Sequence, residues 1–142
     1  MLAAIKAVKI LGIKSKITKK GVKIYGKGIN GYNYKKNITI DARNSGTLGR
    51  LILGLIINTT YPIKIIGDNS LSKRDFRRVT KPLSKFGVQF KLNKNKSLPL
   101  TIFGSQKLKS VKYIEKKGSA QCKSSVIFGG MRANGTTIIR AK

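Results

Sequence analysis

The chain has 142 residues, of which 40% are hydrophobic, and this is enough for one domain with a buried core. No apolar run approaches the roughly 18 residues of a membrane span, and the N-terminal lysines lie within the apolar stretch, unlike those of a secretory signal. The single cysteine, Cys122, excludes an internal disulfide. Because the chain has no histidine, a zinc site is effectively excluded as well. These features predict a cytoplasmic protein that has no membrane partner.

The charge is strongly unbalanced, with 31 basic residues against four acidic ones and a net charge of +27. Such a field attracts polyanions, so nucleic acid is a candidate partner through net charge alone. The alternative is that genome composition supplies the pattern. Of the basic residues, 24 are lysines, scattered singly among many isoleucines and asparagines, and all three residue types have AT-rich codons.

The first half of the chain predicts a helix, three strands, a second helix and a fourth strand. In chain order these are a helix at 3–11 ended by Gly12, strands at 13–17, 23–26 and 37–41, a helix at 48–57 and a strand at 63–66.

The second half repeats the same order of signals. It predicts a helix at 72–86 with Ser72 as N-cap and Gly87 as its stop, strands at 88–92, 101–104 and 111–114, a helix at 122–131 and a strand at 137–140.

Equivalent glycines recur at a nearly constant spacing, 75 residues from Gly12 to Gly87 and 78 residues from Gly26 to Gly104. A recurring order at a fixed period indicates an internal repeat. The sequence therefore predicts an α/β fold, with helices packed on sheets, built as a single partial domain from two repeats at about 1–67 and 68–142.

A loop at residues 43–47 lies directly before the predicted helix at 48–57. Asn44 and Ser45 are good N-caps, and Gly46 lets a ligand approach the backbone. The free N–H groups and the helix dipole, which is equivalent to roughly half a positive charge, suit an anion there. The alternative is that these residues only cap the helix.

A matching loop at residues 118–121 precedes the predicted helix at 122–131. Ser119 can cap that helix or bind an anion, and Gln121 adds an amide beside it. Because equivalent loops of equivalent units tend to lie at the same end of a domain, we expect both helix N-termini to face one cleft.

Arg74 follows a turn at residues 67–72, and its planar guanidinium can hold a carboxylate through two hydrogen bonds. A solvated arginine is the alternative. The neighbouring Arg77, Arg78 and Lys81 are expected to cover a solvent face.

Groups for catalysis are scarce. The chain has no histidine, and its four acids form no pair that could act as acid and base. Asp41 is expected to orient the loop at 43–47, and Cys122 is expected to be buried packing. The chain therefore looks equipped to bind a ligand, and no residue is assigned as catalytic.

Three segments together resemble the 5-enolpyruvylshikimate-3-phosphate synthase family. Its N-[SA]-G-T-x-x-R loop, its G-[DE]-x-S-L-x-K-R-P segment and its S-A-Q-x-K-S loop occur here in that order. The first is matched by Asn44, Ser45, Gly46, Thr47 and Arg50, the second by Gly67, Asp68, Ser70, Leu71, Lys73 and Arg74, and the third by Ser119, Ala120, Gln121, Lys123 and Ser124.

The resemblance implies transfer of an enolpyruvyl group from phosphoenolpyruvate to the 5-hydroxyl of shikimate-3-phosphate, without a metal or organic cofactor. It also implies the inside-out barrel domain of enolpyruvyl transferases. Carried over, Ser119, Ala120 and Gln121 hold shikimate-3-phosphate, with Gln121 also close to phosphoenolpyruvate. By the same resemblance Arg74 binds phosphoenolpyruvate, and Asn44, Gly46 and Thr47 line the pocket.

The chain departs from the family in two ways. The proline after the arginine is Asp75 here, which is expected to pair with Arg74 and weaken its hold on a substrate. Family members are much longer, and their G-D-K-S-x-x-x-R motif and second domain have no match. The resemblance therefore implies part of the first domain, inactive alone, whose partner is the remainder of the enzyme. A basic nucleic-acid-binding module and a non-functional gene fragment are the alternatives.

Overall fold

The computed structural model describes residues 2–116 and 118–141. Its first half contains α1 (Leu2–Ile10), β1 (Ser15–Thr18), β2 (Gly21–Ile24), β3 (Thr39–Asp41), α2 (Gly46–Leu55) and β4 (Ile63–Ile66). Its second half contains a 3-10 turn, η1 (Leu71–Lys73), then α3 (Arg77–Ser84), β5 (Gln89–Leu92), β6 (Leu100–Phe103), β7 (Lys112–Glu115), α4 (Ala120–Gly130) and β8 (Ile138–Ala141).

Helix α3 begins later than the sequence predicts. Ser72 is not an N-cap: its hydroxyl donates to the Gly67 carbonyl at 3.2 Å, within the turn that contains η1. The helix begins only at Arg77, whose N–H donates to the Asp75 carboxylate at 2.7 Å. Because the segment from Asp68 to Arg74 makes its own turn, the predicted helix at 72–86 loses its first five residues.

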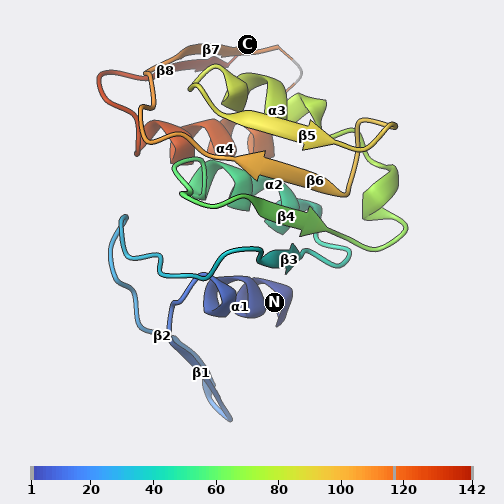
Figure 1. Ribbon diagram of the computed structural model, residues 1–142, viewed down its shortest axis with the longest axis vertical. Coiled ribbons are helices and arrows are strands. Elements are labelled where there is room, and N and C mark those ends of the chain that lie inside the picture. The colour runs from blue at the N-terminus through green and yellow to red at the C-terminus, as the bar shows by residue number, and fades with distance from the viewer. Residues whose placement is uncertain (1, 117, 142) are drawn as a thin grey trace.

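The main sheet has the strand order β3-β4-β6-β5. Strands β3 and β4 are parallel and are joined through α2, whereas β6 runs antiparallel to both β4 and β5. Two smaller sheets flank it: β1 and β2 form an antiparallel hairpin, and β7 and β8 form a parallel pair joined through α4. Figure 1 shows the hairpin and the β7–β8 pair at opposite ends of the long axis.

The helices cover one side of the main sheet, where α2 and α4 lie behind its strands (Figure 1). The core between them is apolar, and strand residues such as Ile63, Ile65 and Ile102 are completely buried. Phe76 and Phe86, on either side of α3, are buried with them. This mixed arrangement confirms the α/β class. No helix within residues 2–116 and 118–141 is long and apolar enough to cross a membrane.

Helices α2 and α4 run in the same direction and are packed closely. A Cβ on Gly54 would lie only 2.0 Å from the Ser125 carbonyl oxygen, so glycine is required at this point of α2. The Ser125 hydroxyl donates to the Arg50 carbonyl at 2.9 Å. Farther along, a Cβ on Gly129 would lie 3.1 Å from the Ile57 side chain. The two helices are thereby fixed in register.

We predict that Gly54→Ala destabilises the protein, although alanine is better than glycine in a helix by about 1 kcal/mol. The added methyl group meets backbone, so the helices must separate, at a cost on the order of 1–3 kcal/mol beyond the helix gain. Urea unfolding measures the change. Gly26→Ala is the control, because nothing lies within 4 Å of its added methyl group. Equal stability of the two variants would contradict the close packing.

Candidate functional site

The N-terminus of α2 is built by the loop that the sequence singled out. Ser45 is the N-cap, and its hydroxyl accepts the N–H of Leu48 at 3.1 Å. The helix begins at Gly46, two residues earlier than predicted, so Gly46 and Thr47 lie in the first turn. The Gly46 N–H donates to the Asn44 carbonyl at 3.1 Å. The Thr47 N–H has no carbonyl partner within the helix because it lies in the first turn, which leaves this donor available to a ligand.

The N-terminus of α4 has the same construction. Ser119 is the N-cap, and its hydroxyl accepts the N–H of Cys122 at 3.3 Å. The helix begins at Ala120, so Ala120 and Gln121 also belong to a first turn. Cys122 is buried, as expected of a packing residue.

Side chains connect the two helix N-termini directly. The Gln121 amide donates to the Thr47 hydroxyl at 2.9 Å, and its amide oxygen accepts from the Arg50 guanidinium at 2.8 Å. Arg50 also donates to the Gly46 carbonyl at 3.3 Å. The structure therefore confirms that the two loops lie side by side at one end of the domain.

Arg50 also belongs to this site, although no role for it was predicted from the sequence. Its guanidinium lies 5.5 Å from the centre of the Phe76 ring, and burial lowers its pKa. The nearby charges of Arg74 and Arg78 act in the same direction. The sequence could have indicated that Arg50 lies at this site, because Arg50 comes four residues after Gly46 and residues four apart share one face of a helix. Its contact with Gln121 fixes that side chain, so Arg50 is a positioning residue.

The turn at residues 67–74 adjoins this pair of N-termini. Asp68 accepts the N–H of Leu71 at 2.8 Å and the side-chain amide of Asn44 at 2.6 Å. These two hydrogen bonds, in that order, lower the pKa of the Asp68 carboxyl. The bond to Asn44 attaches the turn to the loop before α2.

Arg74 is brought beside α2 by the same turn. A Cβ on Gly46 would lie 3.0 Å from the Arg74 guanidinium and 2.8 Å from that of Arg50. Gly46 is itself buried, whereas Arg74 is exposed. Two arginines, two capped helix N-termini and the Gln121 amide therefore meet at one place, although the sequence separates them by up to 77 residues from Asn44 to Gln121.

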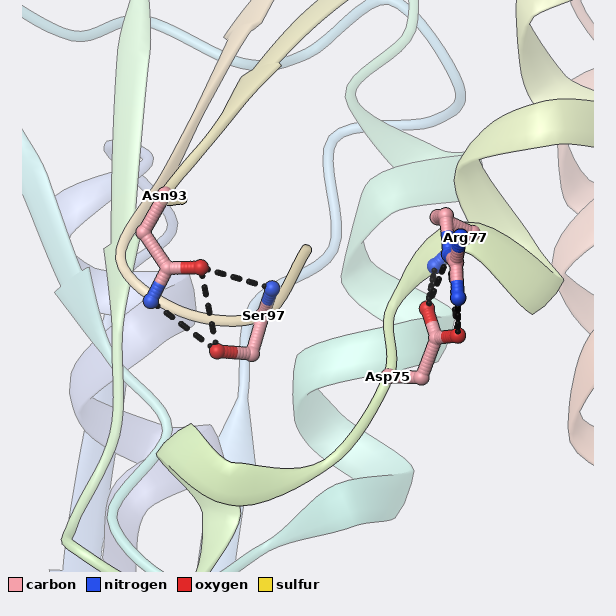
Figure 2. A network of polar contacts seen from close by, with 4 residues as sticks. All are labelled: Asp75, Arg77, Asn93 and Ser97. Atoms are coloured by element: carbon pink, nitrogen blue, oxygen red, sulfur yellow. Dashed lines mark hydrogen bonds and ion pairs between the residues drawn. The ribbon is translucent and has the colours of Figure 1, made fainter. Parts of the chain in front are cut away.

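The expected pairing of Asp75 with Arg74 is wrong. Figure 2 shows the Asp75 carboxylate on the Arg77 guanidinium, with the Arg77 Nη2 atom 2.7 Å away. This contact lowers the pKa of Asp75. Arg74 has an extended backbone, with ψ 138°, so neighbouring side chains point to opposite sides. Arg74 is thereby left beside α2, free of this carboxylate.

The other acidic residues also have partners. Asp41 accepts the backbone N–H of Arg43 at 2.8 Å and pairs with the Arg43 guanidinium at 2.9 Å. This confirms that Asp41 orients the loop before α2. Glu115 is buried and accepts a hydrogen bond from the Tyr113 hydroxyl. Arg77, Arg78 and Lys81 are exposed, as expected of a solvent face.

The matches to known proteins cover almost all of the 142 residues of this chain. The family model described as EPSP synthase (3-phosphoshikimate 1-carboxyvinyltransferase) matches residues 1–141. The 3-phosphoshikimate 1-carboxyvinyltransferase of Streptococcus mutans is 38% identical over 143 residues, and that of Ruthia magnifica is 41% identical over 140 residues.

A solved EPSP synthase from Acinetobacter baumannii superposes with a TM-score of 0.90 at 34% identity, covering 97% of this chain and 31% of that one. The chain spans 33% of the Streptococcus mutans relative and 32% of the Ruthia magnifica relative. The chain therefore belongs to the EPSP synthase (3-phosphoshikimate 1-carboxyvinyltransferase) family.

Proposed function

We propose that this chain supplies a substrate-binding portion of an enzyme that transfers an enolpyruvyl group from phosphoenolpyruvate to shikimate-3-phosphate. The observation that carries the proposal is the direct Thr47–Gln121–Arg50 connection between two serine-capped helix N-termini. It occurs in a member of the EPSP synthase family at the residues that match the family's loops.

The electrostatics of the site favour anionic substrates. Two helix N-termini side by side add their partial positive charges, and each end is worth about 0.3–1 kcal/mol to an anion near the surface. Arg74 adds a full charge with a planar fork of donors. Phosphoenolpyruvate and shikimate-3-phosphate each carry a phosphate and a carboxylate, and they fit this arrangement.

Within this proposal each residue has a separate role. Ser119, Ala120 and Gln121, at the start of α4, bind shikimate-3-phosphate. Arg74 binds phosphoenolpyruvate, and Gln121 lies between the two substrates because Arg50 fixes it toward α2. The remaining three residues line the phosphoenolpyruvate side of the pocket at the start of α2: Asn44, Gly46 and Thr47.

Binding is separate from turnover in this proposal. The reaction forms a bond from the 5-hydroxyl oxygen of shikimate-3-phosphate to C2 of the enolpyruvyl group and breaks the bond from C2 to the phosphate oxygen, so a proton must leave the hydroxyl as phosphate is released. All four carboxylates already have partners: Asp41 with Arg43, Asp68 with Asn44, Asp75 with Arg77, and Glu115 with Tyr113. The acid–base groups are therefore expected from the part of the relatives that this chain does not span, and the chain alone is expected to bind and not to react.

We also propose that the chain consists of two equivalent units, at about residues 1–67 and 68–142. Both halves have the order helix, three strands, helix, strand, with η1 added before α3. Each half has a parallel strand pair joined through a serine-capped helix, namely β3–α2–β4 and β7–α4–β8.

We predict that Arg74→Ala weakens phosphoenolpyruvate binding to the folded chain by roughly tenfold or more, because a charge-assisted contact is worth about 1.5–3 kcal/mol. Isothermal titration of phosphoenolpyruvate into the chain, with shikimate-3-phosphate present, measures the affinity. Arg77→Ala is the matched control: it removes the same charge from a residue engaged with Asp75 and should leave the affinity nearly unchanged. Equal losses in both variants would mean that net charge, not this site, binds the ligand.

We predict further that the 142-residue chain binds shikimate-3-phosphate but releases no phosphate above the uncatalysed rate when both substrates are present. Groups that act as a unit leave only residual catalysis when some are missing. A phosphate-release assay measures it, with a full-length relative as the positive control. Turnover comparable to that of the relative would overturn the assignment of acid–base groups to the unspanned part.

A further inference from the structure

Arg43 has a backbone conformation that does not suit an arginine. Its φ is 52°, in the left-handed region, whereas the φ of the next residue, Asn44, is not positive. These two residues are the centre of a turn that the Ser45 N–H closes by donating to the Ala42 carbonyl at 2.9 Å. A positive φ at the first central position alone is the pattern of a type II′ turn, where glycine dominates. An arginine at this position is therefore unfavourable for folding.

The ion pair that Arg43 makes does not compensate for this conformation. A left-handed residue other than glycine shifts the folding equilibrium toward the unfolded chain by roughly five- to thirtyfold. The Arg43 guanidinium pairs with the Asp41 carboxylate at 2.9 Å, but the two side chains are 69% and 39% exposed. An exposed pair of this kind shifts the equilibrium back by about fivefold at most.

The position of the positive charge is unfavourable as well. Arg43 lies two residues before Ser45, the N-cap of α2. A helix N-terminus carries about half a positive elementary charge, so a cation beside it is repelled. Arg74, which lies beside Gly46 in the first turn of α2, adds a full positive charge. These charges disfavour Arg43 without an anion and favour it once an anion is bound.

Hydrogen bonds of the Arg43 backbone hold this residue between the two segments that form the phosphoenolpyruvate side of the proposed site. Its N–H donates to the Asp41 carboxylate at 2.8 Å, at the end of β3. Its carbonyl accepts the N–H of Asp68 at 3.0 Å, at the start of the turn that carries Arg74. The backbone is thereby fixed, whereas the guanidinium, on a long and exposed side chain, can change its partner.

We propose that Arg43 is a further binding residue of this site. When an anion binds at the start of α2, the Arg43 guanidinium leaves the Asp41 carboxylate and donates to the anion. The ligand group is an oxyanion of phosphoenolpyruvate, because Arg43 joins the loop and the turn that line that side of the pocket, and to this extent the inference rests on the proposed function. A guanidinium matches such a group, since its planar fork donates two parallel hydrogen bonds.

Replacement of Arg43 is expected to change stability and affinity in opposite directions. Arg43→Gly suits the turn, so its urea midpoint without ligand should exceed that of the parent chain. Its affinity for phosphoenolpyruvate, from isothermal titration with shikimate-3-phosphate present, should fall roughly three- to tenfold, since the ligand contact replaces the exposed pair with Asp41. Arg43→Asn should also lose affinity, because asparagine tolerates the left-handed conformation. Unchanged affinity, or a lower midpoint in both variants, would overturn the proposal.

Lys96 offers a matched control. It is an exposed cation in the turn between β5 and β6, and it has nearly the same left-handed conformation, with φ 59°. Lys96→Gly should raise the urea midpoint in the same way and leave the affinity nearly unchanged. An equal loss of affinity in Lys96→Gly would mean that the positive field of the chain attracts the ligand, and it would overturn a contact by Arg43.

A double-mutant cycle tests the exchange of partners. Asp41→Asn keeps an oxygen that can accept the Arg43 N–H but removes the ion pair, so the guanidinium is released to the ligand. The affinity for phosphoenolpyruvate should therefore rise, by about fivefold at most, in the parent chain. In the Arg43→Gly background the same substitution should have a clearly smaller effect. Equal effects in both backgrounds would overturn the exchange.

Arg74→Ala separates a failure of this inference from a failure of the proposed function. Weaker binding by Arg74→Ala together with unchanged binding by Arg43→Gly would overturn the role of Arg43 alone. Unchanged affinity in both variants would overturn the phosphoenolpyruvate site itself, and the role of Arg43 with it. Weaker binding in both, with Lys96→Gly unchanged, is the result that the proposal predicts.

Discussion

The close packing of α2 against α4 is the constraint on which the rest of the structure depends. Two helices that run in the same direction place their positive ends together, which is electrostatically unfavourable unless something compensates. Here Gly54 and Gly129 allow close contact, and the Ser125 hydroxyl bonds to the Arg50 carbonyl. An anion at the shared end would relieve the remaining repulsion, so the packing that stabilises the domain also brings together the two helix ends at which we propose that the substrates bind.

The turn before α3 is held against the same end of α2. Its Asp68 bonds to Asn44 at the start of α2, and Arg74 then lies beside Gly46. A carboxylate next to Arg74 in sequence could have neutralised it, but Asp75 instead accepts the first N–H of α3 and pairs with Arg77. The substitution of aspartate for the family's proline is therefore accommodated as a helix-starting contact, and the charge at the site is retained.

The sequence predicted the order of elements and the two serine caps because these depend on local chemistry. Ser45 and Ser119 each precede an apolar run, and their hydroxyls accept N–H groups only three residues away. The start of α3 was predicted wrongly for a local reason also, since Ser72 and Asp75 are both acceptable caps. The Gln121–Thr47 contact spans 74 residues, and no local pattern reveals it. The repeat predicted that the loops lie together, but not that Arg50 bridges them.

The central claim is that the N-termini of α2 and α4 form one anion-binding site, and titration of the ¹⁵N-labelled chain with shikimate-3-phosphate tests it most directly. The account predicts that backbone amide signals change at the start of α4, near Ser119 to Gln121. Signals at the start of α2, near Gly46 and Thr47, should change at the same ligand concentrations because Gln121 connects the two. Changes spread evenly over the exposed lysines, with none at these two helix ends, would contradict the claim.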